Sequence, residues 1–170
     1  MLVFQFLLAL GLVMLAHARM STDFVTHAVG VFEIKDFLVF NVVSTELRDP
    51  STRATNRTIS FTFTDPNANT TIQCGEAWIN NNTPFNYVYC GNGPNANGFS
   101  SFRFKTYTHA GKFDLQLTHS FSDPTHYPPP YSFVQYFAPA SFELQCNKLR
   151  NNARCIQGGP VRGVINQISN

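Results

Sequence analysis

The clearest structural signal in this 170-residue chain is the heptapeptide Thr58-Ile59-Ser60-Phe61-Thr62-Phe63-Thr64. Every odd position is apolar and every even position carries a hydroxyl group, so an extended backbone would separate the two kinds of side chain onto opposite faces. One face would bury Ile59, Phe61 and Phe63 in a core, and the other would meet water. The heptapeptide therefore predicts a half-buried β-strand.

The same alternation recurs along the chain, with turn signals between the runs. Further runs occupy residues 102–105, 113–121 and 141–146. Asp-Pro, Asn-Gly-Pro and Gly-Gly-Pro sequences interrupt them, and such punctuation of short strands is typical of antiparallel all-β folds. We therefore expect one all-β domain, either a single antiparallel β-barrel or a closely packed sandwich.

An earlier run contains a break in the alternation. Phe32 and Ile34 begin a strand, and the phase changes near Lys35-Asp36 before Leu38, Phe40 and Val42. A β-bulge shifts the side chains of a strand by one position in this way. The sequence predicts a bulge at Lys35-Asp36.

Composition limits the class of protein. Charged residues make up 13% of the chain and the formal net charge is +2, a bias too weak to indicate a nucleic-acid partner. The 44% hydrophobic content excludes a disordered chain, and 17 Phe with 6 Tyr indicate an aromatic core.

The N-terminus predicts export. An apolar run from Leu2 to Ala16 ends in Ala16-His17-Ala18, the small-x-small pattern of a signal-peptidase site. We assign residues 1–18 to a signal peptide and 19–170 to a secreted domain. The alternative is an N-terminal membrane anchor, which needs about 20 residues to span a bilayer, and this run is shorter. No later apolar run approaches that length either.

Four cysteines indicate a disulfide framework in an exported chain. Three pairings of Cys74, Cys90, Cys146 and Cys155 are possible. We predict Cys74–Cys90 and Cys146–Cys155, because each pair is close in sequence and flanks a loop rich in Asn, Gly or Pro. The alternative of a zinc site is disfavoured, because the chain has no CxxC motif and no His at ligand spacing from these cysteines.

Export also makes Asn-x-Thr triplets candidate glycosylation sites. They begin at Asn56, Asn69 and Asn81. All three fall at predicted strand ends or loops, so we expect a glycoprotein.

The chain contains no recognisable catalytic constellation. Beyond the signal peptide its histidines are His27, His109, His119 and His126, and a general acid or base needs one of them beside a carboxylate in a cleft. His119 lies in phase with Leu117 and Phe121, which favours a hydrogen-bonded core histidine. GxSxG, HExxH and phosphate-binding Gly-rich motifs are absent from the sequence, so we expect no catalytic residue, metal or cofactor.

Binding residues are therefore sought in basic side chains and loops. Lys148, Arg150, Arg154 and Arg162 cluster in sequence around the last two cysteines and could steer the domain to an acidic partner. Candidate interface loops are 80–84, 92–98 and 125–131.

Two alternative functions remain open. A carbohydrate- or small-ligand-binding barrel would use exposed aromatics such as Trp78, Tyr127 or Tyr131. A small secreted hydrolase or ribonuclease would need carboxylates or histidines that meet only in three dimensions.

The order of motifs resembles the Alternaria-major-allergen-like family of fungal secreted proteins over about residues 28–168. The resemblance is carried by Ile34-x-Asp36-Phe37, by Thr58–Pro66 running to Cys74, by Tyr87-Val88-Tyr89-Cys90, by the Phe102/Phe104 and Phe113/Leu115/Leu117 strands, and by the Cys146/Cys155 pair.

The resemblance implies an eleven-strand β-barrel with these two disulfides. It also implies a role as effector, elicitor or allergen, binding a plant host protein or cell-wall component. The type allergen forms a disulfide-linked dimer through a further cysteine near the mature N-terminus, and residues 19–31 contain no cysteine, so we expect no such dimer.

The export prediction is tested by mass spectrometry of the secreted protein. Cleavage after Ala18 should give a chain that begins at Arg19, because the apolar run ends at a signal-peptidase site. Extracellular protein that retains Met1, or protein confined to the cytosol, would contradict it.

Overall fold

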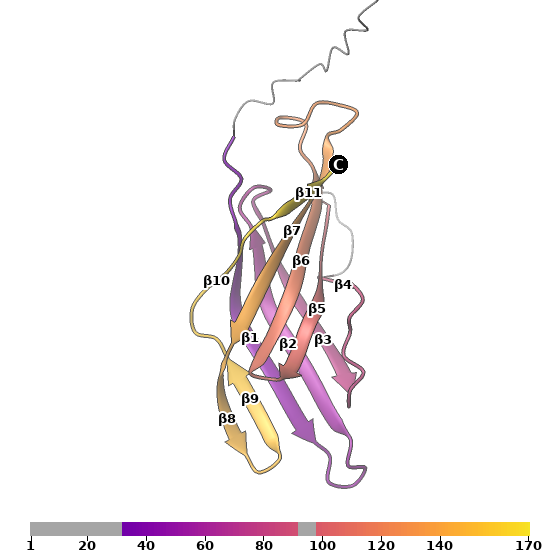
Figure 1. The fold of residues 1–170 in the computed structure, drawn as a ribbon, viewed down its shortest axis with the longest axis vertical. Coiled ribbons are helices and arrows are strands. Elements are labelled where there is room, and N and C mark those ends of the chain that lie inside the picture. The colour runs from indigo at the N-terminus through magenta and orange to yellow at the C-terminus, as the bar shows by residue number, and fades with distance from the viewer. Residues whose placement is uncertain (1–31, 92–97) are drawn as a thin grey trace, which may run out of the picture.

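The computed structural model describes residues 32–91 and 98–170, which form eleven strands in two antiparallel sheets (Figure 1). The strands are β1 Phe37–Arg48, β2 Thr55–Asp65, β3 Thr70–Ile79, β4 Val88–Tyr89, β5 Phe99–His109, β6 Lys112–Ser122, β7 Phe133–Glu143, β8 Gln145–Leu149, β9 Asn152–Ile156, β10 Val161–Gly163 and β11 Gln167–Ser169. These two described ranges contain no helix suited to crossing a bilayer. The predicted signal peptide lies outside them.

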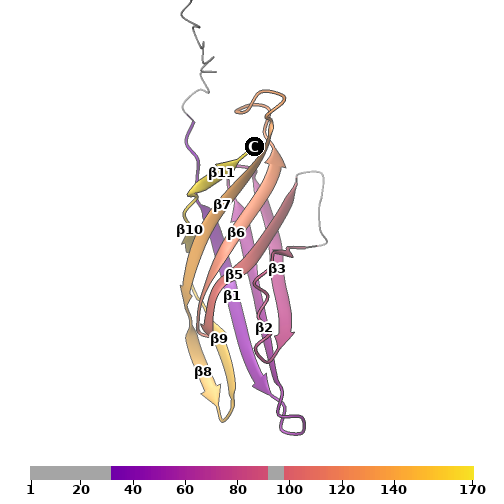
Figure 2. The same ribbon diagram turned by 45° about the vertical axis from the view of Figure 1, so that its right-hand side comes forward.

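The two sheets pack face to face (Figures 1 and 2). Sheet A has the order β3-β2-β1-β9-β8, with β10 also paired to β1, and sheet B has the order β11-β7-β6-β5-β4. No strand ladder joins the sheets within the described ranges, so the all-β prediction is confirmed in its sandwich-like form. The closed barrel stays a prediction.

The core is an aromatic layer between the sheets. Ile59, Phe61 and Phe63 of the heptapeptide 58–64 are all buried, as their alternation predicts. Across the layer, the ring of Phe61 lies 5.1 Å from that of Phe102 in an edge-to-face contact. Trp78 meets Phe104 at 5.2 Å in the same way. Such pairs add to the free energy gained by burying the rings.

The first strand begins later than its sequence predicts, and its bulge lies elsewhere. β1 starts at Phe37, and the buried residues are Phe37 and Val39 rather than Leu38 and Phe40. The register shifts between Phe40 and Val43, where Asn41 has φ 53°. Asparagine tolerates this left-handed conformation better than most residues, so the bulge forms there rather than at Lys35-Asp36.

The alternating run 141–146 is divided between the two sheets. β7 of sheet B ends at Glu143, and β8 of sheet A begins at Gln145. Between them Leu144 is buried, and its N–H donates to the carbonyl of Gly111 at 2.8 Å. The alternation of buried and exposed side chains continues through this run, but the backbone changes its pairing partner at Leu144. Alternation shows which side each residue faces and does not show which strand it pairs with.

Both predicted disulfides are present. Cys74–Cys90 connects β3 of sheet A with the end of β4 of sheet B, beside a hydrogen bond from Gly91 N to the Gln73 carbonyl. Cys146–Cys155 joins directly opposed residues of β8 and β9. Two disulfides indicate an oxidising, extracellular or secretory compartment.

The inter-sheet disulfide should make a large contribution to stability. Replacing both Cys74 and Cys90 by Ala should lower the free energy of unfolding by roughly 2–5 kcal/mol, because the unfolded chain loses a crosslink. Thermal unfolding monitored by circular dichroism measures the change. An unaltered melting temperature would show that β4 does not depend on this bond.

Candidate functional site

The β8–β9 hairpin projects from one end of the sandwich, as the β1–β2 hairpin also does (Figures 1 and 2). It extends past the ends of β5, β6 and β7 (Figures 1 and 2). We call residues 145–156 the basic hairpin. Its two strands are paired from Gln145–Ile156 to Leu149–Asn152, and the Cys146–Cys155 disulfide crosses the ladder one pair from its base. The crosslink keeps the hairpin ordered although β8 is an edge strand.

Three of the four predicted basic residues gather on this hairpin. Lys148 and Arg154 are exposed on opposite faces of it, and exposed Arg150 lies at its tip. Residues 145–156 contain no Asp or Glu. None of the three cations takes part in an ion pair with another described residue. The hairpin therefore presents unneutralised positive charge.

The fourth basic residue is not part of this group. Arg162 lies on β10, and its Nη2 is 2.6 Å from Asp36 Oδ2. Asp36 Oδ1 also accepts a hydrogen bond from the Ile165 N–H. Arg162 thus helps to attach β10 to the segment before β1 and is already neutralised by a carboxylate.

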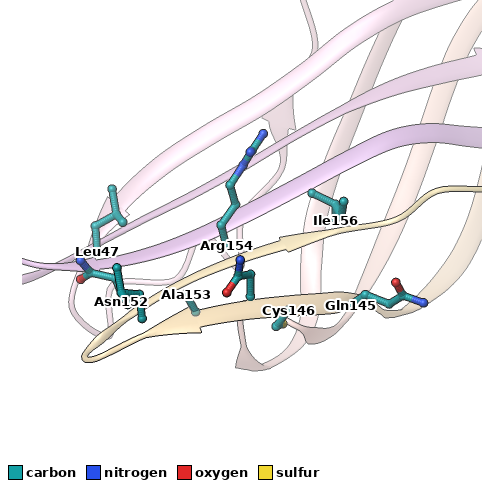
Figure 3. A pocket seen from close by; sticks show the side chains of 9 residues that line it. Leu47, Gln145, Cys146, Asn152, Ala153, Arg154 and Ile156 are labelled. Carbon is teal, nitrogen blue, oxygen red and sulfur yellow. The ribbon is translucent and has the colours of Figure 1, made fainter.

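A groove lies on the basic hairpin itself, bordered by Leu47 of β1 (Figure 3). Its volume is about 620 Å³. Leu47 and Ile156 are exposed along it, Leu149 is 74% exposed near the tip, and Arg154 is the charged residue among its lining. The groove combines an aliphatic surface, side-chain amides and a guanidinium group, which suits an acidic ligand with apolar parts.

The predicted interface loops do not meet. Residues 80–84 follow β3 at the same end as the hairpin tip, whereas 125–131 connect β6 and β7 at the other end (Figure 1). Of the loop 92–98, residues 92–97 lie outside the described ranges.

The predicted glycosylation acceptors Asn56, Asn69 and Asn81 are all exposed, so each side chain is accessible to a glycosyltransferase.

The candidate sugar-binding aromatics are placed differently from the expectation. Trp78 is buried, because its ring packs against Phe104 and, at 5.3 Å, against Tyr107. Tyr127 is half-buried, with its hydroxyl 3.3 Å from that of Tyr136. Tyr131 alone of the three is exposed.

His119 is a hydrogen-bonded core histidine, as its phase predicts. Its Nδ1 lies 2.7 Å from Asp65 Oδ2, and both side chains are buried. The other carboxylate oxygen of Asp65 accepts hydrogen bonds from the backbone N–H and the side-chain amide of Asn67, each at 2.8 Å. The pair connects β6 to β2 and is buried from solvent, so its role is structural: each side chain gives the other a hydrogen-bond partner inside the core.

His126 is the histidine that the structure brings beside a carboxylate at the surface. Its Nδ1 lies 2.7 Å from Asp123 Oδ2, and it borders a cleft of about 310 Å³ that Glu33 and Lys35 also line. The backbone N–H of His126 donates to Asp123 Oδ1, and Phe32 stacks on the imidazole at 4.0 Å. This imidazole could exchange a proton with a ligand, but the residues lining the cleft include no Ser, Thr or Cys nucleophile. The Asp-x-x-His spacing of Asp123 and His126 is the sequence signal that could have indicated this pair.

A second polar cluster lies at the end of the core nearest the hairpin. The Tyr107 hydroxyl and Arg57 Nε both donate to Glu46 Oε1, each at 2.9 Å. Burial raises the pKa of Tyr107 above its ordinary value of 10.0, and the hydrogen bond to Glu46 adds to the rise. Burial likewise raises the pKa of Tyr136, with a further contribution from its hydrogen bond to Tyr127.

Metal-ligating side chains do not cluster in the part of the chain that the structure describes. Residues 32–91 and 98–170 hold no group of three or more His, Cys, Asp or Glu that could bind an ion together.

Comparison with protein-family models, with curated proteins and with solved structures finds no match to this chain.

The two buried phenols predict a loss of stability in alkali. Above about pH 10 the unfolded tyrosines release protons that Tyr107 and Tyr136 retain in the folded state, so the free energy of unfolding should fall as the pH rises. Denaturant titrations between neutral pH and pH 11 measure the fall. Tyr107→Phe should reduce its slope, whereas Tyr131→Phe leaves both buried hydroxyls in place and should keep it. Equal slopes for Tyr107→Phe and the unsubstituted protein would contradict the assignment.

Proposed function

We propose that this chain is a secreted effector- or elicitor-like protein that binds an acidic plant host protein or cell-wall component and catalyses no reaction. The proposal includes membership of the fungal family that the sequence resembles, with its closed barrel, and glycosylation at Asn56, Asn69 and Asn81. The basic hairpin is the observation that carries it.

The hairpin has the physical properties of a recognition element. Its disulfide and five-pair ladder hold it in one conformation, so little conformational entropy is lost when a partner binds. Its cations lie on both faces and at the tip, and such a concentration of one charge attracts an acidic partner over about a Debye length. Leu149 and Ile156 supply apolar surface next to these charges. Charge would steer the encounter, and the aliphatic surface would then be buried.

A hydrolase is the second candidate function, and the His126–Asp123 pair is the observation that favours it. The pair is formed within one turn, and Phe32 covers a face of the imidazole. The cations of the basic hairpin are exposed and unpaired within the described ranges, whereas His126 is paired with Asp123. We therefore place recognition first.

The test compares three preparations infiltrated into plant leaf tissue. Folded protein should elicit a host response, and reduced, alkylated protein should not, because the hairpin and β4 lose their crosslinks. A variant carrying Lys148→Gln, Arg150→Gly and Arg154→Gln should reduce the response about tenfold, as expected when a few charge-assisted contacts are lost. Glycine suits position 150, where φ is 55°, so this change removes charge without straining the turn.

Arg162→Gln is the matched control, since it removes a cation that is already paired with Asp36. It should leave the response unchanged. A triple variant as active as the folded protein would refute recognition by the hairpin. Turnover of a glycan or RNA substrate that His126→Ala abolishes would establish the hydrolase instead.

A further inference from the structure

The exposed large apolar side chains of the described residues differ in type between the two sheets, and Ile168 of β11 is the aliphatic exception on sheet B. Those of sheet A are aliphatic, namely Leu47, Ile79, Leu149 and Ile156. The exposed aromatic side chains are Phe85, Tyr87, Tyr89, Tyr131 and Phe133, which lie on or next to the strands of sheet B. The outer surfaces of the two sheets therefore differ in chemistry.

Strand alternation places a group of aromatic rings on the outer surface of sheet B. Because Phe102 and Leu117 point into the core, their neighbours along β5 and β6 point outward. We call Tyr87, Tyr89, Phe99, Phe133 and Phe137 the aromatic face. Tyr87 directly precedes β4, and the other four lie on β4, β5 and β7. The Tyr89 and Phe99 rings are 5.8 Å apart, and the Phe99 and Phe133 rings are 6.3 Å apart.

Small hydroxyl residues form the floor between these rings. Ser101, Thr118 and Ser120 point outward, yet all three are buried at the base of the larger side chains. The Ser101 and Thr118 hydroxyl oxygens are 2.7 Å apart, and the Ser120 hydroxyl has no hydrogen-bond partner within the described ranges. Because the floor residues are short, the neighbouring rings stand above them.

The region is polar without being charged. Residues 99–102, 117–122, 133–140 and 167–169 contain no Lys, Arg, Asp or Glu. Half-buried Gln135 and exposed Gln167 bring amide groups to it. At its border the Arg103 guanidinium lies over the Tyr87 ring, 4.8 Å from the centroid. Rings, amides and hydroxyls without formal charge select a neutral ligand that can both stack and form hydrogen bonds.

We infer that the aromatic face binds a neutral polysaccharide. The C–H groups on one side of a pyranose ring carry partial positive charge, which matches the negative face of an aromatic ring. Its hydroxyl groups can pair with the glutamine amides. The outward positions of β5, β6 and β7 in this region hold no Leu, Ile, Val or Met, so aromatic rings make up most of its apolar surface.

This face is separate from the basic hairpin. Phe99 and Phe133 lie where β5 and β7 begin, at the end of the sandwich away from the hairpin tip (Figure 1). The two surfaces can therefore be tested independently, and neither proposal depends on the other.

The experiment measures depletion of the full secreted protein from solution by insoluble cellulose, chitin and β-1,3-glucan. At least one of the three should retain it, and retention should persist in about 1 M sodium chloride, where the Debye length is about 3 Å. A variant with Tyr89→Ala and Phe133→Ala should bind about tenfold more weakly, the loss expected for two stacking contacts.

The matched control carries Ile79→Ala and Val164→Ala, which lie outside both the aromatic face and the groove. These side chains are 53% and 55% exposed, against 57% and 51% for Tyr89 and Phe133, so each variant truncates two half-exposed apolar side chains. The control should bind as the unsubstituted protein does, and equal melting temperatures show that both variants are folded.

Three results would overturn the inference. They are retention by none of the three polysaccharides, equal weakening in both variants, and a self-association in sedimentation that only Tyr89→Ala with Phe133→Ala dissolves. The last result would make the aromatic face an interface between copies of this chain. Loss of the leaf response in the hairpin variant, with polysaccharide binding kept, would leave the inference standing.

Discussion

The structure depends on the layer of aromatic rings between its two sheets. Phe61 and Trp78 of sheet A reach across to Phe102 and Phe104 of sheet B, and burying such large side chains supplies most of the free energy that holds the sheets together. Because successive side chains of a strand point to opposite sides, every ring in this layer forces its neighbours outward. The chemistry of both outer surfaces follows from that alternation.

The edges of the sandwich are secured by different means. On one edge the Cys74–Cys90 disulfide and the Gly91–Gln73 hydrogen bond connect β4 to β3. On the other, β10 pairs with the start of β1 and lies against β7. The basic hairpin begins where the chain leaves sheet B at Leu144, so its position depends on one crossing of the backbone from sheet to sheet. The Cys146–Cys155 bond then lets this hairpin extend from the sandwich while remaining ordered.

Buried polar groups organise the end of the core opposite the hairpin. Asp65 and His119 satisfy each other across the sheets, and Asp65 also holds Asn67. The side chain of Asn67 in turn pairs with the backbone N–H and carbonyl of Lys35, both at 2.8 Å. Polar groups in an apolar layer lose free energy unless they are hydrogen-bonded. This chain of contacts meets that requirement and directs residues 32–36 into β1.

Much of the fold could be read from the sequence, because its signals are local. The alternation in 58–64 and 113–117 identified which residues are buried, and the short sequence separations of the cysteines identified both disulfides. The alternation did not reveal that Thr118 and Ser120 are buried as well, because larger side chains from neighbouring strands cover them. The tertiary structure alone decided which strands share a sheet. Leu144 changes sheets without interrupting its alternation, and Arg162 leaves the other cations because it meets Asp36, which is 126 positions away in the chain. Likewise, Tyr89 and Phe133 are brought to one surface only by the pairing of β4, β5, β6 and β7. Periodicity reports the environment of each residue along its own strand, whereas a binding surface consists of residues from several strands whose order is set by packing.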